Sequence, residues 1–256
     1  AAMTRRSLLA LATAATLAAG GTPTAFEQLS AVAWTQTAAE HEALCLQTFG
    51  NALTAVRAAV TEVDRSKPLA VVLDVDETVL DNSPHQAANV LDAKVFAGPA
   101  WSAWVAERRA AALPGAVEFT QACAELGVTP IFVPNRPTAD EPATRDNLRA
   151  AGFPLSEAFD CVLTRGDVDG KSDKSARRAH VTANFTVLAW LGDDLGDFVL
   201  PADTVETRLE QVRDHRARWG TTWFVLPNAM YGTWERALAK QASGASPAAM
   251  LQALQR

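Results

Sequence analysis

The stretch LAVVLDVDET, at residues 69–78, decides the fold class. Its first half, residues 69–73, is a short and continuous apolar run, preceded by Pro68 and followed by acidic residues. Such a run is typical of a strand that is buried on both faces, as the strands of a parallel sheet are. The second half places two carboxylates, Asp74 and Asp76, at the end of that strand.

Runs of the same kind recur and predict further strands. They lie at residues 128–133, 161–164, 187–191 and 223–226. Segments with helical character separate them, at residues 115–126, 141–151, 174–181 and 204–218. The alternation predicts an α/β fold, a Rossmann-like parallel sheet of about five strands with helices on both faces.

Two further segments complete the predicted domain. Residues 26–63 have helical spacing and predict N-terminal helices, either two or one long broken helix. Residues 82–114 are too long for a plain loop, so they predict a small helical cap inserted after the first strand. We therefore expect residues 26–256 to form a single domain with this cap insertion.

The first 25 residues have the pattern of an export signal. Residues 1–2 precede Met3 and are interpreted as an expression scar, and an arginine pair at residues 5–6 precedes the apolar run at 8–19. The pair resembles a twin-arginine signal, and an ordinary secretory signal fits equally well. The run is shorter than the roughly 20 residues that span a bilayer. We expect an exported protein, periplasmic or extracellular, with no evident membrane anchor.

The composition narrows the class of partner. The formal net charge is −6, which argues against nucleic acid as a partner because binding it requires a basic face. The three cysteines, Cys45, Cys123 and Cys161, have no zinc-type spacing. Their odd number allows one disulfide and one free thiol, or no disulfide, and buried, inert thiols are the default expectation. The oligomeric state is left open by the sequence.

Acidic residues follow two of the predicted strands. Asp74 and Asp76 follow the first, and the segment GDDLGD, containing Asp193 and Asp197, follows the run at 187–191. A solvated acidic turn would explain either cluster alone. Because parallel strands end at a common sheet edge, the two clusters together predict one site for a hard cation such as Mg²⁺, which prefers oxygen ligands.

Polar residues also follow the other two central strands. Asn135 comes after the run at 128–133 and can donate a hydrogen bond to a phosphoryl oxygen, and Lys171 and Lys174 follow the run at 161–164. A lysine near a phosphoryl group stabilises its charge, although a solvated pair at a helix start is the simpler interpretation. Residues 166–172 fall one residue short of a P-loop, so a nucleotide triphosphatase is disfavoured.

In this order the four segments resemble the four motifs of the haloacid-dehalogenase superfamily. More closely, the chain resembles the class C bacterial acid phosphatases, the 5′-nucleotidase group that includes the outer-membrane lipoprotein acid phosphatase. The resemblance runs from Trp34 to about Trp234. It rests on the segments AVAWTQTAAEHEAL, VVLDVDETVLDNS, PGAVEF, VPNR, KSDKSAR, GDDLGDF and LPNAMYGTWE, and on the pair Trp101 and Trp104.

The resemblance implies roles for individual residues. Asp74 would be the nucleophile that forms a phospho-aspartate, and Asp76 would protonate the leaving oxygen and then activate water. Lys174 matches the third-motif lysine best, with Lys171 as the second candidate. Mg²⁺ would bind the Asp74 carboxylate, the Asp76 backbone carbonyl and Asp193.

Further residues would support this centre. Asp197 would hold the metal through water or position Lys174, and Asn135 would contact the phosphate. The chain departs from the family at Pro134, where relatives carry Ser or Thr, so one phosphate contact is expected to be missing or to pass to Asn135.

Aromatic residues are the candidates for substrate recognition. In similar proteins they stack on the base of a nucleoside monophosphate, and Phe96 and Tyr231 are the candidates here, with Trp101 as a rival. For Trp101 and Trp104 ordinary packing is the preferred interpretation. The expected function is a Mg²⁺-dependent acid phosphatase acting on a small phosphorylated substrate. A phosphotransferase on the same fold and a silent exported phosphate-binding or nucleotide-binding protein are the alternatives.

Overall fold

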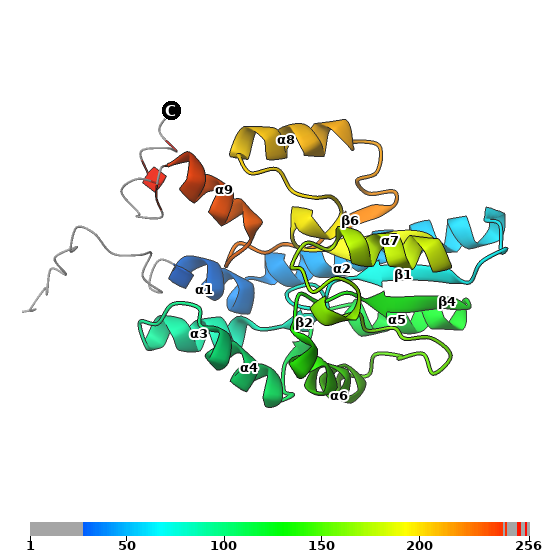
Figure 1. The fold of residues 1–256 in the computed structure, drawn as a ribbon, viewed down its shortest axis with the longest axis horizontal. Coiled ribbons are helices and arrows are strands. Elements are labelled where there is room, and N and C mark those ends of the chain that lie inside the picture. Colours follow the sequence, from blue (N-terminus) through cyan, green and yellow to red (C-terminus); the bar gives the residue numbers. More distant parts are fainter. Residues whose placement is uncertain (1–27, 243, 245–249, 252–253, 255–256) are drawn as a thin grey trace, which may run out of the picture.

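A computed structural model describes residues 28–242, 244, 250–251 and 254 of the chain (Figure 1). The predicted export signal at residues 1–25 lies outside the described residues. The chain begins its described part with two helices, α1 (Leu29–Thr37) and α2 (Ala39–Glu62). The helical periodicity of residues 26–63 is thus realised as two helices rather than as one broken helix.

The core of the molecule is a parallel sheet of four strands in the order β4-β1-β5-β6. The strands are β1 (Leu69–Leu73), β4 (Val128–Phe132), β5 (Thr186–Gly192) and β6 (Trp223–Val225). Every residue of β1 is buried, as expected for a central strand covered on both faces. The predicted α/β fold class is confirmed.

Helices cover both faces of this sheet. The helices between and after the strands are α5 (Ala116–Glu125), α6 (Glu141–Ala151), α7 (Ser175–Asn184), α8 (Val205–Asp214) and α9 (Thr233–Gln241). Leu69, Val71 and Leu73 of β1 belong to the apolar core shared with α2 and α5, whereas Ala70 and Val72 pack on the side of α7. This alternation follows from the period of two along a strand.

The prediction of a strand at residues 161–164 is wrong. Val162 forms only an isolated parallel bridge with Phe132 of β4. The Phe132 N–H donates to the Cys161 carbonyl, and alternate residues of an extended chain face the same way, so the next N–H groups on this edge would be those of residue 130 in β4 and residue 134 just after it. Pro130 and Pro134 have no N–H, so the ladder cannot extend in either direction.

The segment after β1 contains the predicted helical insertion. It holds α3 (Ser83–Leu91) and α4 (Gly98–Ala106), between the two short antiparallel strands β2 (Leu80–Asp81) and β3 (Ala111–Ala112). Figure 1 shows α3 and α4 at the same end of the sheet as α1, and α1 contacts α3. The insertion therefore stands beside the end of the sheet where β1 stops.

Two further expectations concern the described residues. All three cysteines are buried and free, and burial raises the pKa of the Cys45 thiol to about 11, which agrees with inert thiols. Among the described helices, none is both long enough and apolar enough to cross a membrane.

Candidate active site

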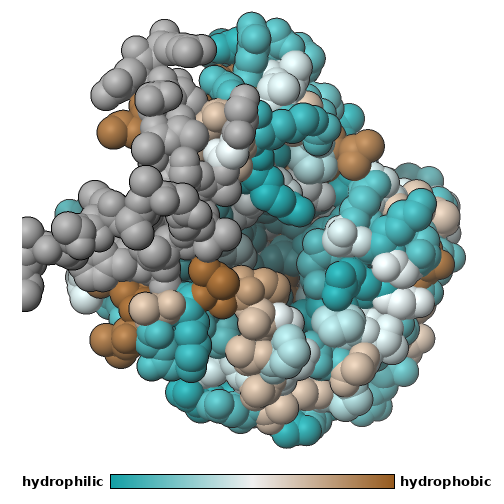
Figure 2. All heavy atoms as spheres, turned by 60° about the vertical axis from the view of Figure 1, so that its left-hand side comes forward, coloured by the Kyte–Doolittle hydropathy of each residue, from teal (hydrophilic) through white to brown (hydrophobic). Residues whose placement is uncertain are grey.

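A cleft of about 980 Å³ opens at the carboxyl ends of the strands. Figure 2 shows the molecule hollowed on this side. The sequence-predicted residues that line it come from several loops and from the insertion: Asp74, Asp76, Phe96, Trp101, Asn135, Lys174, Asp193, Asp197 and Tyr231. This is the edge of a parallel α/β sheet at which ligands bind.

Asp74 is the first residue after β1 and lies almost fully buried at the base of the cleft. Its backbone N–H donates to the Leu191 carbonyl of β5 at 3.0 Å, so the sheet ladder fixes its position. One carboxylate oxygen, Oδ1, forms an ion pair with Lys174 Nζ. The second oxygen has no partner among the described residues and remains available to a ligand.

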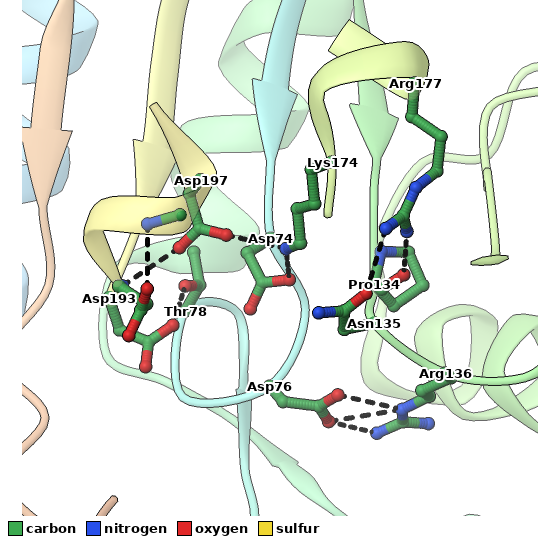
Figure 3. A network of polar contacts seen from close by, with 12 residues as sticks. Asp74, Asp76, Thr78, Pro134, Asn135, Arg136, Lys174, Arg177, Asp193 and Asp197 are labelled. Atoms are coloured by element: carbon green, nitrogen blue, oxygen red, sulfur yellow. Dashed lines mark hydrogen bonds and ion pairs between the residues drawn. The ribbon is translucent and has the colours of Figure 1, made fainter. Parts of the chain in front are cut away.

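Lys174 joins Asp74 to a second acid. Its Nζ also lies 2.6 Å from Asp197 Oδ1, and the lysine is buried. Figure 3 shows Lys174 between the two carboxylates. Burial opposes the charged form, but the neighbouring Asp197 and Asp74 raise the pKa of Lys174 and keep it cationic. Lys171, the second candidate, is exposed and does not line the cleft, so the structure favours Lys174.

Asp193 lies beside this pair, in the loop after β5. Its Oδ1 accepts a hydrogen bond from Thr78 Oγ1 at 3.2 Å and its Oδ2 accepts one from Asn228 Nδ2 at 2.7 Å. One oxygen from each of Asp74, Asp193 and Asp197 lies within 4.8 Å of the others. The predicted meeting of the two acidic loops is therefore present in the structure.

The charges of this cluster do not balance. Burial raises the pKa of Asp74 to about 7, although Lys174 lowers it, and the nearby Asp197 and Asp76 raise it further. Burial, Asp197 and Asp74 likewise raise the pKa of Asp193 well above its ordinary range. One lysine faces three carboxylates, and the side-chain atoms that could bind a metal here are all oxygen atoms. The site therefore fits a hard divalent cation.

A glycine sets the position of Asp197. A Cβ atom at Gly192 would lie 2.3 Å from Asp197 Oδ2, so only glycine leaves room for this side chain. Asp197 Oδ2 also accepts a hydrogen bond from the Asp194 N–H at 2.9 Å. Asp197 pairs with a full positive charge on Lys174, whereas the partners of Asp193 are neutral, so Asp197 is better placed to hold Lys174 than to bind a metal.

Asp76 lies apart from the carboxylate cluster, although it lines the same cleft. Figure 3 shows its carboxylate turned toward Arg136, whose Nη2 lies 2.6 Å from Asp76 Oδ1. Asn82 Nδ2 donates to the same oxygen at 3.0 Å. In the sequence, Arg136 belongs to the VPNR segment, and its position directly after Asn135 is the signal that could have assigned it a role.

The second-motif loop contributes Asn135, which is exposed to the cleft. Its Oδ1 accepts a hydrogen bond from Arg177 Nη2 at 2.9 Å. The sequence alone did not identify Arg177, Thr78 or Asn228. These residues form hydrogen bonds with Asn135 or Asp193, and no sequence motif marks such partners.

The aromatic candidates all line the cleft. Phe96 is 66% exposed, and its ring lies 6.3 Å from that of Trp101. Tyr231 lines the cleft from the segment after β6. Trp104 instead is buried, and its Nε1 donates to Asn82 Oδ1 at 2.8 Å, so the packing interpretation holds for this tryptophan.

Comparisons with known proteins agree on one family. Residues 6–234 match the family model described as HAD superfamily, subfamily IIIB (acid phosphatase). A structure of the class C acid phosphatase from Bacillus anthracis is similar, with a TM-score of 0.81 and 34% identity, over 90% of this chain and 96% of that chain. A structure of that protein with tungstate bound matches with the same TM-score and coverage, at 33% identity.

A curated plant protein also matches. Acid phosphatase 1 of Solanum lycopersicum is 30% identical over 164 residues, which are 62% of this chain and 57% of that protein. The match thus spans little more than half the length of this curated relative.

Proposed function

Because the chain belongs to the acid phosphatases of subfamily IIIB of the HAD superfamily, we propose that it hydrolyses small phosphate monoesters with Asp74 as the nucleophile. The observation that carries the proposal is the environment of Asp74. One of its oxygens forms an ion pair with Lys174, and the other has no partner among the described residues. An oxygen of Asp193 lies close enough to Asp74 for both carboxylates to bind one metal ion.

In the first step the free Asp74 oxygen attacks the phosphorus atom. A bond forms between this oxygen and phosphorus, the bond from phosphorus to the alcohol oxygen breaks, and a phospho-aspartate results. Asp76, in its protonated form, gives its proton to the departing alcohol oxygen. Lys174 lies beside the attacking carboxylate, where its charge stabilises the negative charge of the phosphoryl oxygens.

In the second step water attacks the phosphorus atom of the phospho-aspartate. Asp76, now ionised, takes a proton from this water, the bond from Asp74 to phosphorus breaks, and phosphate leaves. Arg136 and Asn82 hold the Asp76 carboxylate at the wall of the cleft. The two aspartates thus have separate roles because they have separate partners.

The carboxylates of Asp74 and Asp193, together with the backbone carbonyl of Asp76, would hold the metal, for which we propose Mg²⁺. Their oxygen atoms are suitable ligands for a hard cation, and such a cation would neutralise the excess negative charge of the cluster. When bound, the ion supplies positive charge to the phosphate oxygens. The tungstate complex of the Bacillus anthracis relative supports a tetrahedral oxyanion site in this fold.

For the substrate we propose nucleoside monophosphates among other monoesters. Phe96 and Tyr231 line the cleft that contains Asp74, and an exposed aromatic ring can stack on any base. We also propose that the protein is exported, on the basis of the arginine pair and apolar run within residues 1–25.

A p-nitrophenyl phosphate assay tests this function. The wild-type protein with Mg²⁺ should release phosphate, a chelator should stop the release, and renewed Mg²⁺ should restore it. Asp74→Asn should lose activity by a factor on the order of 10⁴ or more, since the nucleophile is removed. Asp64→Asn is the matched control, because Asp64 is an exposed aspartate outside the cleft.

Two results would contradict the proposal. Turnover by Asp74→Asn at the wild-type rate would remove the nucleophile. Phosphate release at the background rate by the folded wild-type protein would favour the silent phosphate-binding alternative.

A further inference from the structure

Arg177 of α7 connects two loops of the candidate active site from the interior of the protein. Its side chain is fully buried. Nη1 donates to the Pro134 carbonyl at 2.7 Å, and Nη2 donates to Asn135 Oδ1 at 2.9 Å (Figure 3). Nη2 also lies 3.2 Å from the Lys171 carbonyl, so the guanidinium ties the loop after β4 to the loop before α7.

This buried cation has no ion-pair partner among the described residues. Its hydrogen-bond acceptors are neutral carbonyl and amide oxygens, and its Nε has no partner. Burial lowers the pKa of Arg177, while the charge of Asp74 opposes this. A buried charge without a carboxylate is costly to the fold, so stability alone does not explain an arginine here.

The chemistry of the two groups fixes the orientation of Asn135. A guanidinium can only donate hydrogen bonds, whereas an amide has one accepting end and one donating end. Arg177 therefore binds the oxygen of Asn135 and leaves its NH₂ directed away. Figure 3 shows this NH₂ on the side of Asp74, and it has no acceptor within the part of the chain that the structure describes.

We infer that Arg177 is a positioning residue, which holds the Asn135 amide so that its NH₂ donates to the phosphoryl group. The inference rests on the proposed function. Asn135 is then the more important phosphate contact of this loop, because Pro134 offers neither a hydroxyl nor an N–H to the phosphate. The Pro134 carbonyl instead serves as the second anchor of Arg177.

A double-mutant cycle tests this relation. Asn135→Ala should lower kcat/KM for p-nitrophenyl phosphate by roughly 10²–10³-fold, the loss typical of one transition-state hydrogen-bond donor. Arg177→Ala should cause a loss of the same order. The double variant should be within about 3-fold of the poorer single variant, because Arg177 acts on the phosphoryl group through Asn135. Losses that multiply would overturn the inference.

Chemical rescue separates positioning from a structural role. Guanidinium chloride, kept below its denaturing range, should restore activity to Arg177→Ala but not to Arg177→Ala/Asn135→Ala. Equal recovery of both variants, or recovery of neither while both keep the wild-type circular dichroism spectrum, would contradict the inference.

Two conservative variants decide the matter if Arg177→Ala does not fold. Arg177→Lys keeps the buried charge but not the planar fork, so it should remain impaired about 10-fold or more. Asn135→Asp presents an acceptor where the NH₂ stood and should lose at least as much activity as Asn135→Ala. Wild-type activity in either variant would overturn the inference. An inactive wild-type protein would instead refute the proposed function.

Discussion

Asp74 and Asp76 stand two residues apart and have different partners. Asp74 forms an ion pair with Lys174 and lies next to the Asp193 carboxylate. Asp76 instead forms an ion pair with Arg136 and accepts a hydrogen bond from Asn82. Neighbouring carboxylates acquire different chemical roles when their environments differ in this way. The proposed roles of the two residues, nucleophile for Asp74 and acid for Asp76, rest on this difference.

The aromatic residues of the cleft lead to a prediction about selectivity. Phe96→Ala and Tyr231→Ala should each lower the ratio of kcat/KM for a nucleoside monophosphate to that for glycerol phosphate, by about 10-fold. The reason is that stacking contributes roughly 1–3 kcal/mol per base, and glycerol phosphate has no base. Steady-state kinetics with both substrates provide the measurement. An unchanged ratio in both variants would exclude these rings from base recognition.

At the residue scale the sequence predicted the charged centre well. Asp74 and Asp193 follow β1 and β5, whose ends parallel topology brings together. Lys174 instead stands directly before α7, after a run that forms no strand. The partners of these residues were not predictable in the same way. Arg136 binds Asp76, which lies 60 residues away in the sequence, and Arg177 binds Asn135, which lies 42 residues away. No local sequence pattern encodes such distant pairs.

At the element scale the turn after β5 controls the site. Gly192 ends this strand, and Asp197 packs against it while holding Lys174. Gly192→Ala should therefore displace Asp197, lower the free energy of unfolding by about 1–3 kcal/mol, and reduce kcat more than it changes KM. Urea unfolding and steady-state kinetics test the two parts.

The matched control for this variant is Gly50→Ala, which lies in α2. A Cβ at Gly50 meets nothing within 4 Å, so this change should leave kcat at the wild-type value. If Gly192→Ala had wild-type stability and kcat, the close approach of Asp197 would not matter for the reaction.

Strand positions show how far sequence patterns reach. The apolar runs located β1, β4, β5 and β6, because a buried strand needs apolar side chains on both faces. The run at 161–164 is also apolar but pairs only at one residue, since Pro130 in β4 and Pro134 just after it have no N–H to donate. Helix α9 was not predicted, because its segment lies in the polar region after the last apolar run.

At the scale of the whole molecule, the unbalanced charges make stability depend on pH. Burial raises the pKa of Asp74 from its ordinary value of 3.8 to about 7, so the folded protein keeps a proton that the unfolded chain releases. In a chelator, the contribution of Asp74 to the free energy of unfolding should thus be largest near pH 4 and should be lost as the pH rises to 7. The contribution of Asp74 is on the order of 4 kcal/mol.

Thermal unfolding between pH 4 and 7 tests this dependence. Mg²⁺ should raise the Tm more at pH 7 than at pH 4, because it neutralises carboxylates that are ionised only at the higher pH. Asp74→Asn should flatten the profile. A chelated wild-type protein whose stability rises between pH 4 and 7 would contradict the charge imbalance.

The overall architecture was more predictable than the cleft itself. Alternating helices and strands imply a parallel sheet with its ligand site at one edge. The shape of the cleft depends on how α3, α4 and the loops after β5 and β6 pack around that edge. Long-range packing of this kind determines that Phe96, Trp101 and Tyr231 line one space, and the sequence could only offer them as candidates.

The central claim is that Asp74 carries the phosphoryl group. The most direct test uses the variant Asp76→Asn, incubated with Mg²⁺ and p-nitrophenyl phosphate. This substrate is chosen because nitrophenol leaves readily without protonation by an acid. Attack by Asp74 should continue while activation of water fails, so phospho-aspartate should accumulate. Acid quenching and peptide mass spectrometry should find one added phosphoryl group on Asp74, with a matching burst of nitrophenol. Phosphate on another residue, or a burst with Asp74 unmodified, would contradict the account.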